Sequence, residues 1–223
     1  MKVLGVEFLR SAAAEADFPR DPAPQVALVG RSNVGKSSLI NALTRSKVAR
    51  TSAAPGKTRL LNLYLVRLSG LSPERLYLVD LPGYGYARGG ARSASAFDAL
   101  VGEYFAHAPA CTGGRRTSVG FGPAAAVLVV DARHPGLSAD RTALDWLRAW
   151  RRPVAVAVSK IDKLSRAARP RAEKDWAEAL NVPILPVSAV TGEGLDELWK
   201  RISRLLNAPR GPSGLPKAAT PTT

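Results

Sequence analysis

The stretch VALVGRSNVGKSSLINAL, residues 26–43, decides the fold. It places the pattern G-x-x-x-x-G-K-[ST] between an apolar run typical of a strand and a run with the apolar spacing of a helix. Gly30 and Gly35 let the backbone turn tightly, so successive N–H groups can face a phosphate at the positive end of the helix. Lys36 is expected to reach the β- and γ-phosphates, and Ser37 to ligate Mg²⁺. The stretch therefore predicts a phosphate-binding loop rather than a chance glycine turn.

Outward from this loop, apolar strand-like runs alternate with helix-like runs. The runs 60–68 and 74–81 are joined by SGLSP and predict a hairpin. We expect an α/β fold, a Ras-like domain of three layers, with a six-stranded, mostly parallel sheet and one antiparallel edge strand. Ser138 is expected to cap the helix that it begins. The further strands are expected at 124–132, 153–159 and 183–188, and the further helices at 93–107, 138–150, 171–180 and 194–206.

Length and composition indicate one domain with loose ends. The 223 residues are expected to divide into a lead-in, 1–24, a domain, 25–206, with an insertion at 109–123, and a disordered tail, 207–223, rich in Pro, Gly, Ser and Thr. Cys111 is the single cysteine, which excludes a disulfide scaffold. No run approaches the roughly 20 apolar residues of a membrane span, and Glu7 and Arg10 interrupt any secretion signal. A cytoplasmic protein without integral membrane association is expected.

The net charge is strongly positive. The chain has 32 Lys and Arg against 18 Asp and Glu, for a formal net charge of +14. Such a balance favours a polyanionic partner, above all nucleic acid. The alternative is a compositional bias toward Arg, which does not explain why acidic residues are so few.

Three later motifs follow the phosphate loop in a set order, each at the end of an expected strand. In DLPG, residues 80–83, Asp80 can hold Mg²⁺ and the Gly83 N–H can bond a γ-phosphate. In SKID, residues 159–162, Asp162 can accept from the N1–H and the amine of guanine, which adenine cannot satisfy. In SAVTGEG, residues 188–194, the Ala189 N–H can meet guanine O6.

Each of these motifs is weak alone, and their order gives them weight. Ligands of such sheets bind outside the carboxyl ends of the strands, where all four motifs fall. Thr58, between the first two motifs, has the position of a threonine that completes Mg²⁺ coordination when a γ-phosphate is present. The sequence therefore predicts a guanine nucleotide site.

The motifs GRSNVGKSSLINAL, PGKTRLLN, DLPGYGYA, DARHPG, SKIDKL and SAVTGEGLDEL together resemble the EngB (YihA/YsxC) family, among the Era/TrmE-like GTPases. The resemblance covers nearly all of residues 8–206. It implies a Ras-like domain and Mg²⁺-dependent GTP binding and hydrolysis. It also implies a role in assembly of the large ribosomal subunit, with links to cell division and septation.

The resemblance assigns roles residue by residue. It implies catalytic roles for Lys36, Thr58 and Gly83, and metal ligation by Ser37, Thr58 and Asp80. Ser159 stands where the family usually has Thr. The nucleotide contacts that it implies are Gly30, Arg31, Ser32, Asn33, Val34, Gly35, Lys36, Ser37, Ser38, Gly56, Lys57, Thr58, Asp80, Leu81, Pro82, Gly83, Ser159, Lys160, Asp162, Lys163, Ser188 and Ala189.

The residue after DLPG bears on the rate of hydrolysis. Ras-type enzymes have a water-orienting glutamine there, and this chain has Tyr84, so slow intrinsic turnover is expected. Asn33 is compatible with K⁺ beside the phosphates and equally with a simple loop-capping role. Tyr84, Tyr86, Arg88 and Arg92 suit RNA contact, with an inward-packed tyrosine as the alternative.

The motifs predict the nucleotide partners, and the resemblance implies the ribosomal one. The expected partners are GTP or GDP and the large ribosomal subunit or its precursor, bound by a monomer that switches with its nucleotide. The alternative function is a basic RNA-binding module in which a guanine nucleotide is structural.

Overall fold

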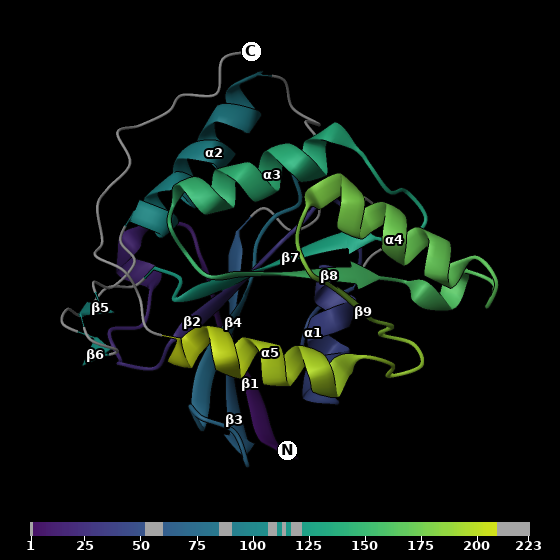
Figure 1. Cartoon of the computed structure of the whole chain (residues 1–223). Helices are drawn as coiled ribbons and strands as arrows, with labels where there is room; N and C mark the ends of the chain where they lie inside the picture. Colours follow the sequence, from purple (N-terminus) through teal and green to yellow (C-terminus); the bar gives the residue numbers. More distant parts are fainter. Residues whose placement is uncertain are drawn as a thin grey trace.

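The fold has three layers, a seven-stranded sheet between two layers of helices, as Figure 1 shows. This computed structural model describes residues 2–51, 60–84, 91–106, 111–112, 115–116 and 122–208. In spatial order the strands are β1 (Lys2–Ala12), β3 (Leu61–Ser69), β4 (Arg75–Asp80), β2 (Gln25–Val29), β7 (Ala125–Asp131), β8 (Val154–Ser159) and β9 (Ile184–Pro186).

The middle of the sheet is parallel and apolar. β2 lies between β4 and β7, with Ala27 paired to Val79 on one side and to Ala126 on the other. Every residue of β2 and β7 is buried. Strands covered by helices on both faces need apolar residues at every position, which explains their continuous rather than alternating apolar runs.

The strand count and the edge correct the sequence expectation. The sheet has seven strands rather than six, because β1 occupies much of the expected lead-in, 1–24. β3 pairs antiparallel with both β1 and β4, so the antiparallel strand is covered on both sides and β1 is the edge. β1 was missed because Leu4 and Phe8 are exposed and two register shifts break its apolar alternation.

Two helices cover one face of the sheet and three the other (Figure 1). On the first face, α1 (Lys36–Thr44) and α5 (Leu195–Asn207) meet where the Trp199 indole donates to the Leu43 carbonyl at 3.1 Å. The other face carries α2 (Ala91–Ala106), α3 (Ser138–Ala149) and α4 (Arg169–Leu180). None of the described helices is long and apolar enough to cross a membrane.

Four short elements complete the described chain. They are the 3₁₀ turns η1 (Glu15–Asp17) and η2 (Ile161–Lys163) and the paired strands β5 (Cys111–Thr112) and β6 (Arg115–Arg116). β5 and β6 lie within the expected insertion. The predicted cap of α3 is wrong by one residue, since Leu137 is the N-cap and Ser138 is already helical.

Parallel pairing brings four loop starts to one edge of the sheet. β2, β4, β7 and β8 run in the same direction, so their carboxyl ends lie together. The residues after these strands hold the motifs found in the sequence.

Candidate functional site

The phosphate loop has a backbone that requires its glycines. A Cβ on Gly30 would lie 2.4 Å from the Val129 carbonyl oxygen and 2.9 Å from a methyl of Val34. Gly35, the N-cap of α1, has φ +101°, and Asn33 has φ +63°. This left-handed backbone turns the chain from β2 directly into α1. The first N–H groups of α1 have no carbonyl within the helix and point to the loop.

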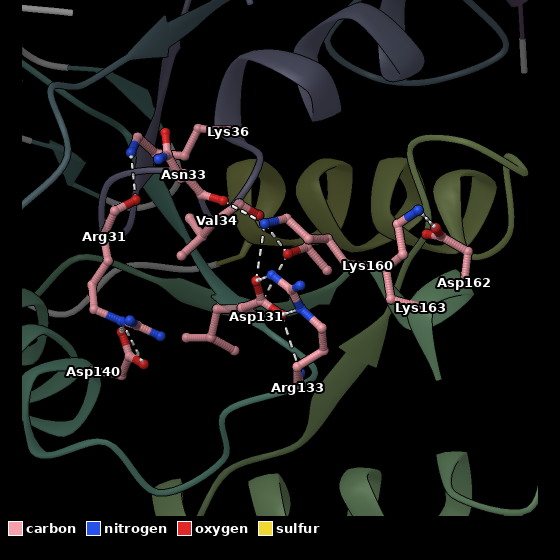
Figure 2. A network of polar contacts seen from close by, with 12 residues as sticks. Arg31, Asn33, Val34, Lys36, Asp131, Arg133, Asp140, Lys160, Asp162 and Lys163 are labelled. Atoms are coloured by element: carbon pink, nitrogen blue, oxygen red, sulfur yellow. Dashed lines mark hydrogen bonds and ion pairs between the residues drawn. The ribbon is translucent and has the colours of Figure 1, made fainter. Parts of the chain in front are cut away.

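Lys36 is held inside its own loop. The side chain is buried, and its ammonium donates to the carbonyls of Gly30 at 2.8 Å and Arg31 at 3.1 Å, as seen for Arg31 in Figure 2. Burial lowers the pKa of Lys36 to about 8, opposed by the nearby carboxylate of Asp80. An anion beside the loop would stabilise the charged form of this lysine.

Asp80 and Ser37 form a small oxygen-rich pair at the end of β4. The Ser37 hydroxyl donates to Asp80 Oδ2 at 2.5 Å. Asp80 Oδ1 is buried and has no hydrogen-bond partner among the described residues. Burial raises the pKa of Asp80, opposed by Lys36 and Ser37. A hydroxyl and an unpartnered carboxylate oxygen are the hard ligands that Mg²⁺ takes, so this pair fits the metal. Gly56, Lys57 and Thr58 lie outside the described residues.

The DLPG segment packs against the phosphate loop. A Cβ on Gly83 would lie 2.4 Å from the Ser32 nitrogen, which only glycine avoids. The Ser32 N–H donates to the Tyr84 carbonyl at 3.3 Å, and Arg31 and Tyr84 form a parallel bridge. Leu81 N–H donates to the Leu28 carbonyl at 3.2 Å. The two phosphate-end motifs are thus in direct contact.

Tyr84 is turned toward α3. Its hydroxyl donates to Asp140 Oδ1 at 2.8 Å, and Arg31 Nε donates to both oxygens of the same carboxylate, at 3.1 and 3.2 Å. The sequence left two interpretations of Tyr84 open, RNA contact and inward packing, and its side chain packs inward. Tyr86 and Arg88 lie outside the described residues, and so does the side chain of Arg92.

Asp162, the carboxylate expected to read the base, is held by Ser188 on one oxygen and lies 3.9 Å from the Lys163 ammonium on the other. Asp162 lies in η2, and its Oδ1 accepts from the buried hydroxyl of Ser188 at 2.7 Å. The Ser188 oxygen itself accepts the N–H groups of Val190 at 3.2 Å and Thr191 at 3.1 Å. SKID and SAVTGEG therefore meet through one hydrogen bond. Ala189, in the same loop, is partly buried.

Lys160 joins this end to the phosphate loop. Its backbone is left-handed, with φ +62°, and its ammonium donates to the Asn33 carbonyl and, at 2.9 Å, to Asp131 Oδ2 (Figure 2). Arg133 also donates to the Asp131 carboxylate, from Nε at 2.9 Å and from Nη2 at 2.7 Å. Burial works against the charge of Asp131, but the hydrogen bonds from Arg133 and Lys160 hold its pKa well below the usual range.

A second tie runs through Ser159. Its buried hydroxyl lies 2.6 Å from the Val34 carbonyl oxygen and 2.9 Å from that of Val130. The loop after β2 thus contacts the end of β8, and the same hydroxyl lies against the end of β7.

Three residues of this network were not predicted as site residues: Asp131, Arg133 and Asp140. Asp131 and Arg133 belong to DARHPG, which follows a buried strand at the same sheet edge, and that position was the signal. Asp140 had no comparable signal, because it lies in a helix with an ordinary amphipathic pattern.

Fold and site together define a P-loop GTPase: a glycine-bounded loop before a helix, a serine–aspartate pair beside it, and the SKID aspartate at the same edge of the sheet. A family model described as "50S ribosome-binding GTPase" matches residues 25–160. A "Probable GTP-binding protein EngB" of Pelotomaculum thermopropionicum is 43% identical over 209 residues, covering 92% of this chain and 96% of the relative. The protein of the same description from Chlorobium luteolum is 37% identical over the full length of both. The chain belongs to the EngB family within these GTPases.

Solved structures agree on the fold. Aquifex aeolicus Era bound to GDP and AlF₄⁻ matches with a TM-score of 0.63 at 24% identity, covering 85% of this chain and 58% of Era. A crystal structure of a probable GTP-binding protein engB matches with a TM-score of 0.57 at 24% identity, covering 82% of this chain and 98% of that one.

Proposed function

We propose that this GTPase binds GTP and GDP, hydrolyses GTP with Mg²⁺, and acts in the cytoplasm as a nucleotide switch in assembly of the large ribosomal subunit, and through it in cell division and septation. The observation that supports the nucleotide part is the contact between Lys160, two residues before Asp162, and the carbonyl of Asn33 in the loop that leads to Lys36. Asp162, the proposed guanine reader, and Lys36, the proposed phosphate contact, therefore lie along the same edge of the sheet.

Guanine selection rests on Asp162. With Oδ1 occupied by the Ser188 hydroxyl, the carboxylate is oriented and keeps acceptor capacity for the N1–H and amine of guanine. Adenine offers no such pair of donors, so with adenine the carboxylate would gain no hydrogen bonds from the base and would keep only its Ser188 bond and its ion pair with Lys163 at 3.9 Å. Ala189 supplies the N–H proposed for O6, and Lys160 lies between base and phosphate loop.

Mg²⁺ would be held by Ser37 and Asp80, with Thr58 as the further ligand. When bound, the metal would neutralise negative charge on the phosphates and the charge that develops as the phosphoryl group is transferred. Lys36 adds a cation on the loop side, and Gly83 offers its N–H to the γ-phosphate.

Intrinsic hydrolysis is proposed to be slow. Phosphoryl transfer needs a positioned water, and the hydroxyl of Tyr84 is engaged by Asp140 instead. A partner is therefore expected to complete the site. K⁺ beside Asn33 is the other proposed accelerator: turnover higher in K⁺ than in Na⁺ supports it, and equal turnover removes it.

The proposed role in ribosome assembly is supported by the net charge and by similarity to other GTPases. The net charge of +14 suits RNA. One of the solved structures with this fold is described as Era in complex with MgGDPNP and nucleotides 1506–1542 of 16S ribosomal RNA, at a TM-score of 0.61 and 24% identity, covering 89% of this chain and 59% of Era. That RNA belongs to the small subunit, so support for the large subunit comes from the family description "50S ribosome-binding GTPase".

The test is cosedimentation with purified ribosomal subunits and their precursors, run with a non-hydrolysable GTP analogue and with GDP. Physiological salt is essential, because at low salt a protein of this charge binds any RNA. Association with the large subunit or its precursor in the GTP-like state alone is expected. Equal association in both states would instead support the RNA-binding module with a structural nucleotide.

A further inference from the structure

Asp140 is a fully buried carboxylate outside every nucleotide motif. It lies in the first turn of α3, with 0% of its surface exposed. It accepts from the guanidinium of Arg31 in the phosphate loop and from the hydroxyl of Tyr84 after DLPG. Figure 2 shows the Arg31 side chain reaching Asp140 on the side away from Lys36. Three separate segments thus meet at one carboxylate.

Tyr84 is a permanent donor to this carboxylate. Burial, with the adjacent Asp140, raises the pKa of the Tyr84 hydroxyl well above its ordinary value, so the proton stays on tyrosine at any physiological pH. A hydrogen bond to a charged acceptor is among the stronger ones in proteins.

The backbone of the same residues fixes Gly83. The Ser32 N–H bonds the Tyr84 carbonyl, and the Cα of Gly83 lies against Ser32. Arg31 contributes twice, since its carbonyl also accepts from Lys36 at 3.1 Å. Anchoring the side chains of Arg31 and Tyr84 therefore holds the Gly83 backbone beside the phosphate loop.

We propose that Asp140 is a positioning residue for GTP: it anchors Tyr84 and Arg31 so that Gly83 is placed beside the phosphate loop before the γ-phosphate arrives. This role rests on the proposed function, in which Gly83 contacts the γ-phosphate. GDP has no γ-phosphate, so the anchor contributes to GTP affinity and not to GDP affinity. A preset Gly83 spares GTP the cost of ordering this segment.

The first test is Tyr84→Phe, which removes one hydroxyl and keeps the ring. Affinities for a non-hydrolysable GTP analogue and for GDP are measured by fluorescent-nucleotide titration with saturating Mg²⁺. Affinity for the analogue is expected to fall about tenfold while that for GDP changes less than about twofold. The matched control is Tyr77→Phe, whose hydroxyl donates to Asp21 at 2.7 Å on a residue paired with Gln25, at the other end of β2. It should change neither affinity.

The second test is Asp140→Asn, alone and combined with Tyr84→Phe. The effects of the two substitutions on the ratio of GTP-analogue affinity to GDP affinity are expected to be non-additive, since both alter the same hydrogen bond. Tyr84→Phe keeps the test open if Asp140→Asn does not fold. An unchanged ratio in Tyr84→Phe, or equal weakening of both nucleotides, overturns the anchor alone. Failure of the unaltered protein to bind either nucleotide overturns the proposed function itself.

Discussion

The two ends of the nucleotide site are built in opposite ways. At the base end, Asp162 is bonded by Ser188, and Asp131 by Lys160 and Arg133. At the phosphate end, Lys36 is a desolvated cation and Asp80 keeps an oxygen without a partner among the described residues. The carboxylates of the proposed base end thus already have partners, whereas the phosphate end carries charges that a polyphosphate and a metal would satisfy. Under the proposed function, the guanine contact is preset, and the burial cost of Lys36 and Asp80 is relieved when nucleotide and metal bind.

The largest expected effect breaks the base end. In Asp162→Asn, the Ser188 hydroxyl still bonds Oδ1, so the new amide NH₂ faces the base in place of an acceptor. Loss of two charge-assisted bonds lowers GTP affinity about a thousandfold. Xanthosine triphosphate, with a carbonyl where guanosine has its amine, becomes the better ligand. Competition titration of both nucleotides checks this, and unaltered preference for GTP would contradict the assigned role of Asp162.

The next prediction concerns the phosphate end alone: titration of Lys36 should make the free energy of unfolding depend on pH. The pKa of Lys36 is lowered to about 8 in the folded chain from an ordinary 10.5, so above pH 8 the unfolded chain binds more protons. The free energy of unfolding of the ligand-free protein should therefore rise as pH increases from 8 toward 10.5, by up to about 3 kcal/mol. Below pH 8 the folded chain bears the full destabilisation from burying the charged lysine.

Lys36→Met removes this titration and is the matched comparison. Denaturant unfolding between pH 7 and 9.5 should show the rise in the unaltered protein and not in the variant. Parallel curves for the two proteins would show that Lys36 is not the group responsible. Nucleotide affinity of Lys36→Met should fall for GTP and GDP alike, because both carry the β-phosphate.

A third change sharpens the contrast through the metal. Asp80→Asn replaces the carboxylate that faces Ser37 by a poor Mg²⁺ ligand. GTP affinity in Mg²⁺ is expected to fall about thirtyfold, whereas in excess chelator the variant and the unaltered protein should bind alike. An equal loss in both conditions would assign Asp80 a structural role instead.

The smallest effect tests the link between the ends. Ser159→Ala removes a buried hydroxyl that lies within hydrogen-bond distance of two carbonyls, so the free energy of unfolding should fall by about 1–2 kcal/mol. Ser203→Ala, whose exposed hydroxyl bonds the Ser72 carbonyl, is the control and should cost less. If denaturant unfolding showed equal losses of unfolding free energy for the two variants, Ser159 would not be a stabilising link between the two ends.

The sequence predicted the parts of this molecule that follow local rules. The phosphate loop and the apolar strands β2, β7 and β8 carry patterns that few other structures share. The layered fold could therefore be predicted from the sequence. β1 could not, because its pairing with β3 depends on a strand about 60 residues away and its exposed Phe8 hides the alternation. Boundaries such as the start of α3 at Ser138 shift by a residue for reasons of local geometry.

The site divides in the same way. That Lys36, Asp80 and Asp162 lie along one edge of the sheet was predictable, because each lies at or after the end of an apolar strand at a motif spacing; their roles toward the nucleotide stay predictions. Asp140 was not predictable, since its role exists only once α3 lies beside the phosphate loop and Tyr84. Contacts between segments distant in sequence leave no periodic trace.

The sheet order has a consequence for how the chain is made. β1 to β4 come from residues 2–80 and form one side of the sheet, and β7 to β9, from residues 125–186, form the other. Within the described sheet, the two sides are joined by the pairing of β2 with β7. A growing chain that leaves its ribosome therefore presents the phosphate loop and Asp80 long before Asp162 exists. In the proposed site, guanine nucleotide can span the seam only after Asp162 has been made, and its binding then favours the joined halves by mass action.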